Sequence, residues 1–229
     1  MNILAIDTSS KYLCLSIAKD DKIVAGIRRS FAGEMSEKII PSIDSALRQS
    51  KLSLKAIDYF GIGLGPGSFT GLRIGLAAIK GLAFPFNKPI VGVGSLDLLA
   101  SAVTNHSALI CPILDARRSL LYAAIYQGKN AILIRKTSYL LVSIEELLER
   151  LKPKDKVIFL GDGLKLYSGV IKNKLFSLAV FADENLWYPK PEVLLSCVKE
   201  RIVNRQFLNL HKLVPIYLYP KECQIIKSS

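Results

Sequence analysis

An apolar segment that ends in an aspartate and is followed by a polar turn occurs twice, once near the start of the chain and again near its middle. When the sequence is shifted by 108 residues without gaps, Ile3–Asp7 lies on Cys111–Asp115, and both segments end in an aspartate. In each copy, two further strand-like segments follow after short polar turns. Such a repeat predicts a duplicated α/β unit, in which three antiparallel strands precede alternating helices and strands.

The same shift assigns counterparts to the second and third strands. They are expected at 13–18 and 23–28 in the first copy, and at 121–125 and 131–135 in the second. Residues 1–104 and 105–229 should then form two domains. The aspartates that end the two first strands would face the cleft between them, which is the usual place for a phosphate or metal site in open α/β folds. Taken alone, Asp7 or Asp115 fits a turn or cap residue equally well.

The remaining elements follow from periodicity and from start signals. Apolar residues at helical spacing predict a first helix from Met35 to Leu47, although Pro41 requires a later start or a kink. Ser143–Glu146 has the form of a capping box, and Pro191 suits the first position of a last helix. The other expected strands are 59–63, 90–93, 109–114 and 157–160, and the other expected helices are 70–84, 95–102 and 144–151.

Gly65–Gly75 reads Gly-Pro-Gly-Ser-Phe-Thr-Gly-Leu-Arg-Ile-Gly and joins an apolar strand to a helix. It matches neither Gly-x-x-x-x-Gly-Lys-Ser/Thr nor Gly-x-Gly-x-x-Gly, the two common phosphate loops. It still brings backbone N–H groups, with Ser68, Thr70 and Arg73, to a helix N-terminus, which favours anions. The segment therefore predicts either an anion site or a place where another backbone approaches closely.

The helix after this turn carries only Arg73 and Lys80 as charges, and a helix that is apolar nearly all round is buried on more than one side. Its glycines each cost roughly 1 kcal/mol relative to alanine, which close approach of another helix would offset. Together with the first helix, it could join the equivalent pair of another subunit in a four-helix arrangement. Cover by the chain's own two domains is the alternative. The expected interface residues are Met35, Ile39, Ile40, Ile43, Phe69, Gly71, Leu72 and Gly75.

The composition is that of a folded, basic protein. Half of the 229 residues are apolar and the net charge is +12, with nineteen Lys and Arg against ten Asp and Glu in residues 117–229. A basic half favours polyanions such as RNA, although solubility alone would explain it as well. The longest apolar runs, such as 76–83, are broken well short of a membrane span, and the N-terminus does not read as a signal peptide. We therefore expect a cytoplasmic protein without a membrane partner.

Metal-binding patterns are missing from the sequence. The cysteines include no Cys-x-x-Cys pair, and neither histidine has another ligand at a helical spacing. We expect neither a disulfide framework nor a metal. These residues are Cys14, Cys111, Cys197, Cys223, His106 and His211.

The motifs resemble the TsaB family, the partner subunit of the bacterial tRNA threonylcarbamoyladenosine synthase. The resemblance rests on Leu4–Ser9, Glu37–Pro41, Gly65–Gly75 and Asp115–Arg117, with thinner support in the second domain. It implies the actin, sugar kinase and Hsp70 superfamily, with two ribonuclease H-like halves of which the second is divergent. It also implies a non-catalytic subunit that supports a TsaD-type subunit, which transfers a threonylcarbamoyl group to the adenosine 3′ of the anticodon in tRNAs reading codons that begin with A.

The resemblance implies the remaining partners as well. A TsaE-type ATPase joins the pair, and tRNA is bound through the complex. ATP is used by the partner subunits, and this chain is expected to have no cofactor of its own. The same helices could form a homodimer when the chain is isolated.

Two departures argue against catalysis by this chain alone. TsaD-type relatives carry His-x-x-x-His for a metal on the first helix, where this sequence has Met35 and Ile39. The superfamily's second phosphate loop needs glycines after its aspartate, whereas Ala116–Arg118 follows Asp115. We therefore expect no catalytic residue. The alternative is an ATP-dependent transferase or kinase that acts on its own through Asp7, Asp115 and the glycine-rich turn, and a metallopeptidase would lack any ligand set.

Overall fold

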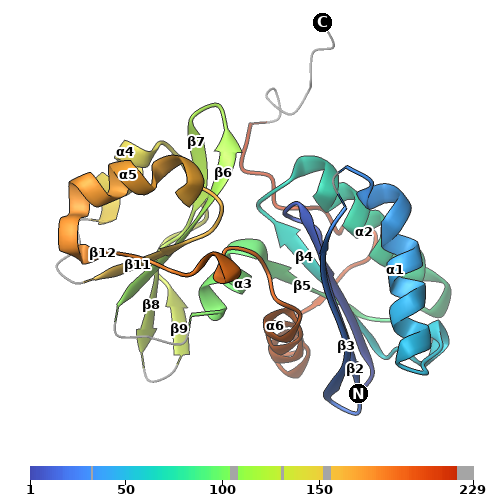
Figure 1. Cartoon of the computed structure of the whole chain (residues 1–229). Coiled ribbons are helices and arrows are strands. Elements are labelled where there is room, and N and C mark those ends of the chain that lie inside the picture. The colour runs from blue at the N-terminus through green and yellow to red at the C-terminus, as the bar shows by residue number, and fades with distance from the viewer. Residues whose placement is uncertain (32, 104–107, 130–131, 152–155, 221–229) are drawn as a thin grey trace, which may run out of the picture. The chain divides into compact units, whose positions relative to one another are not determined.

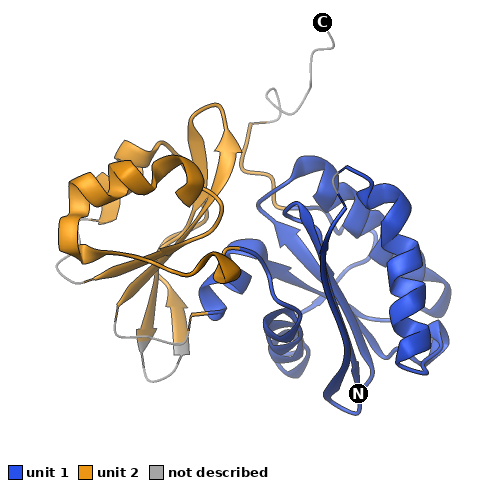
Figure 2. Cartoon of the chain, viewed as in Figure 1, with its two compact units in different colours: residues 1–102, 188–215 blue, residues 103–187, 216–229 orange. Residues whose placement is uncertain are grey.

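The computed structural model describes residues 1–31, 33–103, 108–129, 132–151 and 156–220 (Figure 1). The chain divides into two compact units (Figure 2). The first comprises Met1–Ala102 and Tyr188–Pro215, and the second comprises Val103–Trp187 and Ile216–Ser229. The expectation that residues 105–229 form the second domain is wrong for 188–215, because this segment packs in the first unit. The expected boundary between 104 and 105 lies outside the described residues.

The first unit is built on one mixed sheet of six strands in the order β13-β5-β4-β1-β2-β3. The first three strands are antiparallel, as predicted, whereas β1, β4 and β5 are parallel. The short β13 pairs antiparallel with β5. The strands are β1 (Ile3–Asp7), β2 (Tyr12–Lys19), β3 (Lys22–Ser30), β4 (Tyr59–Gly65), β5 (Ile90–Gly94) and β13 (Phe207–Leu208).

Helices cover both faces of this sheet, and this explains why every residue of β1 is buried. Leu4 and Ile6 point to the face covered by α1 and α2, while Ile3 and Ala5 point to the face covered by α6. Successive strand residues alternate between faces, so each apolar run feeds two cores. The helices are α1 (Met35–Gln49), α2 (Phe69–Ala83), α3 (Ser95–Ser101) and α6 (Pro191–Val203), with short 3₁₀ turns at Leu54–Ala56 and Phe84–Phe86.

The second unit has a sheet with the order β10-β7-β6-β11-β12, and β8 pairs with both β6 and β9. Its core lies between this sheet and the helices α4 and α5. The strands are β6 (Leu109–Arg117), β7 (Leu120–Ala123), β8 (Tyr126–Lys129), β9 (Ile132–Arg135), β10 (Leu140–Val142), β11 (Val157–Leu160) and β12 (Ala179–Phe181). The helices are α4 (Ile144–Leu151) and α5 (Leu164–Leu175), followed by 3₁₀ turns at Phe176–Leu178 and Glu184–Leu186.

The two sheets share the strand order of a ribonuclease H-like fold, so the predicted α/β duplication is confirmed. β6 takes the place of β1, and β11 lies beside it in parallel as β4 does beside β1. The third strand differs from expectation because the copy divides it into β9, which pairs with β8, and β10, which pairs with β7. Ala131, the expected start of this strand, lies outside the described residues.

The start signals read from the sequence have the predicted effect. The N–H of Glu146 donates to Ser143 Oγ and the N–H of Ser143 donates to Glu146 Oε2, both at 3.2 Å, so the capping box before α4 is confirmed. Pro191 is the first residue of α6. Pro41 lies inside α1, where its side chain is exposed, and the helix already begins at Met35.

Candidate functional site

The glycine-rich segment is seated on the turn between β1 and β2. The backbone N–H of Ser68 donates to the carbonyl oxygen of Ser9 at 2.7 Å. Thr8 Oγ1 donates to the carbonyl oxygen of Gly71, also at 2.7 Å. The Ser68 side chain caps α2 by accepting from the N–H of Gly71 at 3.2 Å. These bonds fix the first turn of α2 against the end of β1.

The glycines allow this close approach within the unit itself. A Cβ atom at Gly67 would overlap the carbonyl oxygen of Ser9, and one at Gly71 or Gly75 would overlap Thr8. The expectation that close approach of a partner helix explains Gly71 and Gly75 is therefore wrong. Gly81 differs, because a Cβ atom there would meet no atom within 4 Å among the described residues.

Most of the predicted interface is occupied by the chain's own core. The stripe of α1 and the first turns of α2 face the sheet, because that is where an amphipathic helix buries its apolar side. Ile40 is 47% exposed and Phe69 is half-buried, so the core does not enclose these two. The expected interface residues that the structure buries are Met35, Ile39, Ile43, Gly71, Leu72 and Gly75.

The side of α2 that faces away from the sheet offers an exposed surface to a partner. α1 and α2 pack side by side on the same face of the sheet (Figure 1). We call the outer α2 stripe the residues that recur at helical spacing on the other side of α2. Phe84 in this stripe is 62% exposed. The stripe consists of Thr70, Arg73, Ala77, Gly81 and Phe84, the residue that follows α2, and Ile40 is exposed on the neighbouring α1.

The predicted anion contacts at the start of α2 have different surroundings. Thr70 is exposed, and the guanidinium of Arg73 stacks 3.8 Å above the ring of Phe69. Ser68 is exposed but already uses its hydroxyl oxygen as the helix cap. Thr70 and Arg73 can therefore reach an anion more readily than Ser68.

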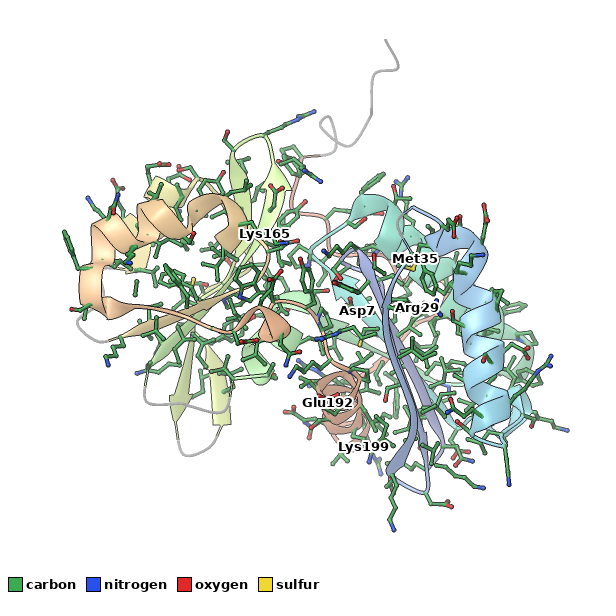
Figure 3. The ribbon with its side chains drawn as sticks, in the orientation of Figure 1. Asp7, Arg29, Met35, Lys165, Glu192 and Lys199 are labelled. Carbon is green, nitrogen blue, oxygen red and sulfur yellow. The ribbon has the colours of Figure 1, made fainter. Side chains whose placement is uncertain are left out.

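Asp7 is sealed inside the first unit. Its side chain has no exposed surface, and Asp7, labelled in Figure 3, is the last residue of β1. Oδ1 accepts from the N–H and the hydroxyl of Ser9, and Oδ2 accepts from the hydroxyl of Ser95. Burial raises the pKa of Asp7 above its ordinary value, although the bonds from Ser9 and Ser95 act in the opposite direction. The expectation that Asp7 contacts a nucleotide or other anion is wrong for this conformation, because its own chain surrounds it.

Asp115 holds the turn between β6 and β7. Its Oδ1 accepts from the N–H of Arg117 at 2.8 Å, and its Oδ2 lies 3.3 Å from the Arg117 guanidinium. The N–H of Asp115 donates to Asp162 Oδ1 at 3.1 Å. Burial raises the pKa of Asp162, while this bond lowers it. Asp7 and Asp115 belong to different units, so a cleft shared by them stays a prediction.

Sequence reasoning missed one feature of this turn. Arg117, Arg118 and Ser119 all have left-handed backbone conformations, with φ values of 67°, 51° and 59°. Each such residue costs about 1–2 kcal/mol when it carries a side chain. The hydroxyl of Tyr219 contacts the carbonyl oxygens of Ala116 and Arg117 at 2.9 and 3.2 Å and so helps to hold the turn. No local pattern could predict this contact, because about a hundred residues separate its partners.

Within the described residues, no three His, Cys, Asp or Glu side chains gather as a metal site would require. His106 and Cys223 lie outside those residues.

One described segment, Phe69–Phe86, is apolar enough and long enough to span a membrane, judged by composition and length alone, contrary to the expectation from the sequence. It packs on β4 and α1, and 33% of it is buried.

Two units of ribonuclease H-like strand order, with an aspartate at or near the end of the first strand of each, define a protein of the actin, sugar kinase and Hsp70 class. Comparison with known proteins identifies the family within this class. The sequence model of TsaD, described as tRNA N6-adenosine threonylcarbamoyltransferase, matches residues 28–220. The tRNA threonylcarbamoyladenosine biosynthesis protein TsaB of Bacillus subtilis is 33% identical over 98% of this chain and 96% of its own length. The chain belongs to the TsaB family.

More distant relatives agree with this assignment. The Escherichia coli protein of the same name is 28% identical over 95% of this chain and 94% of its own length. The solved structure of YeaZ from Pseudomonas aeruginosa superposes with a TM-score of 0.81 at 23% identity. The match covers 95% of this chain and 99% of that one, so both proteins share one fold over nearly their full lengths.

Proposed function

We propose that this chain is a non-catalytic subunit that binds and supports a TsaD-type subunit in forming N6-threonylcarbamoyladenosine in tRNA. The names of its relatives place them in this biosynthesis, and the match to the TsaD sequence model suggests a partner built on the same fold. Two related chains with similar helix pairs could pack them together as a four-helix arrangement. The tRNAs would be those that read codons beginning with A.

Gly81 is the observation that carries this proposal. A glycine inside a helix costs roughly 1 kcal/mol relative to alanine. Gly71 and Gly75 are required by Thr8, but the described part of the chain offers nothing that requires Gly81. A partner helix lying close to the outer α2 stripe would explain it, and would also cover Ile40 and Phe84, which are large and exposed.

Several features support a non-catalytic role. Asp7 is buried with both carboxylate oxygens engaged. Met35 and Ile39 occupy the positions where TsaD-type proteins carry metal-binding histidines, and both are buried in the apolar core. We propose accordingly that this chain has no cofactor of its own, that ATP is used by its partners, and that a TsaE-type ATPase joins the complex in the cytoplasm. The outer α2 stripe would also serve a homodimer of the isolated chain.

The test is assembly with a TsaD-type protein. Ala77→Glu and Ile40→Glu place a charge on the proposed interface, and Val203→Glu places one at an exposed apolar position on α6. We expect the wild type and the Val203 variant to form a heterodimer in size-exclusion chromatography, and the other two to remain separate. Heterodimers of unchanged stability with Ala77→Glu and Ile40→Glu would exclude this surface. Ile39 and Leu72 are unsuitable for this test, because a charge at either position would disrupt the core.

A further inference from the structure

The turn between β6 and β7 keeps three side chains at positions where glycine would be more favourable. Arg117, Arg118 and Ser119 are consecutive left-handed residues, and among the described residues no other non-glycine run of this kind reaches three. Strained backbone persists where the surroundings impose it, and it gathers at functional sites. The strained conformation therefore points to a function for the side chains of this turn.

The carboxylates of this region support the turn from within. Asp115 binds the N–H of Arg117, and Asp162 binds the N–H of Asp115. The side chain of Asp115 is 20% exposed, whereas that of Arg117 is 87% exposed. The acidic groups therefore lie inward and bind the main chain, while the guanidinium groups form the outer surface of the turn.

The arginines are free to exchange their partners. The ion pair between Arg117 and Asp115 is largely exposed, and such pairs contribute little to stability. Arg118 is exposed. Lys165 in the first turn of α5, labelled in Figure 3, acts together with Arg117 on Asp162, while its ammonium group lies 3.4 Å from the carboxylate of Glu184. Guanidinium groups bind phosphates through two parallel hydrogen bonds, which makes an arginine pair well suited to a phosphodiester backbone.

Tyr219, from a distant part of the chain, stabilises the turn between β6 and β7. Its hydroxyl contacts the carbonyl oxygens of Ala116 and Arg117, and its ring meets that of Tyr122 edge to face with 6.2 Å between centroids. Tyr122 projects from β7, so the aromatic contact joins the C-terminal segment to the hairpin. These contacts fix the backbone from which both arginines project.

We propose that the Arg117–Arg118 turn binds the phosphate backbone of RNA, with Tyr219 as the positioning residue. The inference rests on the proposed function, since a subunit of a tRNA-modifying complex meets tRNA as its partner's substrate. The charge of the unit is consistent with it. Residues 103–187 and 216–229 together hold fourteen Lys and Arg against nine Asp and Glu.

The test measures tRNA binding by fluorescence anisotropy for the chain alone and for its mixture with a TsaD-type protein, over about 50–200 mM salt. Arg117→Gln with Arg118→Gln removes two charges while keeping most of each stem. We expect roughly tenfold weaker binding at low salt, and a salt slope that falls by about two because two phosphate contacts are lost. Tyr219→Phe keeps both charges, so we expect weaker binding with the same slope.

The matched control is Lys172→Gln with Lys174→Gln, which removes two exposed charges from α5 in the same unit. The proposal would be overturned if the arginine variant kept the wild-type affinity and slope. It would also be overturned if the lysine control lost as much tRNA affinity as the arginine variant. A wild-type complex that forms but does not bind tRNA would also overturn it, while leaving the proposed pairing with a TsaD-type subunit intact. If the arginine variant instead loses its protein partner and not tRNA, the turn is a protein contact. If no complex forms, the proposed function fails, and the slope measured on the chain alone still decides this inference.

Discussion

Thr8 Oγ1 donates a hydrogen bond of 2.7 Å to the carbonyl oxygen of Gly71, and this bond joins the turn after β1 to the first turn of α2. Both residues are buried. A Cβ atom at Gly71 would overlap the carbonyl oxygen of Thr8, and one at Gly75 would overlap the Thr8 side chain. The position of α2, and with it the outer α2 stripe, therefore depends on a short turn more than sixty residues earlier in the chain.

Gly75 and Gly81 should respond in opposite ways to the same substitution. Gly75→Ala would force a Cβ atom into Thr8, and overpacking of this kind costs about 1–3 kcal/mol. Gly81→Ala meets no neighbour within 4 Å, so the free energy of unfolding should rise by up to about 1 kcal/mol. Urea denaturation of the two variants checks both signs. Equal effects would show that Thr8 does not restrict α2 as described.

Removal of the Thr8 hydroxyl tests the bond directly. Thr8→Val keeps the shape of the side chain but leaves the carbonyl oxygen of Gly71 without this donor, and we expect a loss of about 1–3 kcal/mol. Thr8→Ser keeps the donor and is the control, since it should restore part of the stability. If the valine variant is as stable as the wild type, the bond makes no measurable contribution to holding α2 in place.

Asp7 should make stability depend on pH. Burial raises its pKa in the folded chain, so the folded state binds this proton more tightly than the unfolded state does. Its contribution is therefore greatest below the ordinary pKa of an aspartate and is lost as the pH rises through the raised value. Asp7→Asn should remove this dependence and be at least as stable as the wild type near neutrality. Denaturation of both proteins from about pH 4 to pH 8 checks the difference, and parallel curves would contradict the assignment.

The capping box of α4 offers a local test in the second unit. Ser143→Ala should destabilise this helix by about 1 kcal/mol, because the N–H of Glu146 loses its acceptor. Glu145→Ala, in the same turn and exposed, is the control and should change stability by less. Hydrogen exchange of the amides in α4 reports the effect without interference from the first unit. Equal exchange rates in the two variants would argue against the box.

Binding of Mg-ATP separates the proposed subunit from an independent enzyme. We expect no micromolar binding by the isolated chain in calorimetric titration, because Asp7 is enclosed and Asp115 is bound to its own turn. Micromolar binding that is lost on Thr70→Ala and Arg73→Ala would favour the transferase or kinase alternative. It would also place the nucleotide at the start of α2.

Periodicity predicted most strands and helices, but not what each apolar surface would contact. The stripe containing Ile39 reads the same whether the chain's own sheet or a partner covers it, and the structure assigns it to the sheet. α5 escaped prediction because Leu166 and Val170 are apolar yet exposed, which blurs its amphipathic pattern. The return of α6 to the first unit depends on contacts between segments far apart in sequence, such as Val198 against Gly61.

The return of α6 also sets an order on the synthesis of this protein. Ile3 and Ala5 need Leu194 and Val198 to complete the core on their side of the sheet. The first unit begins to leave the ribosome first but is completed late, since all of β6–β12 is made before α6. Until then its nascent sheet exposes an apolar layer, and a truncation after the first five strands would leave that layer open permanently.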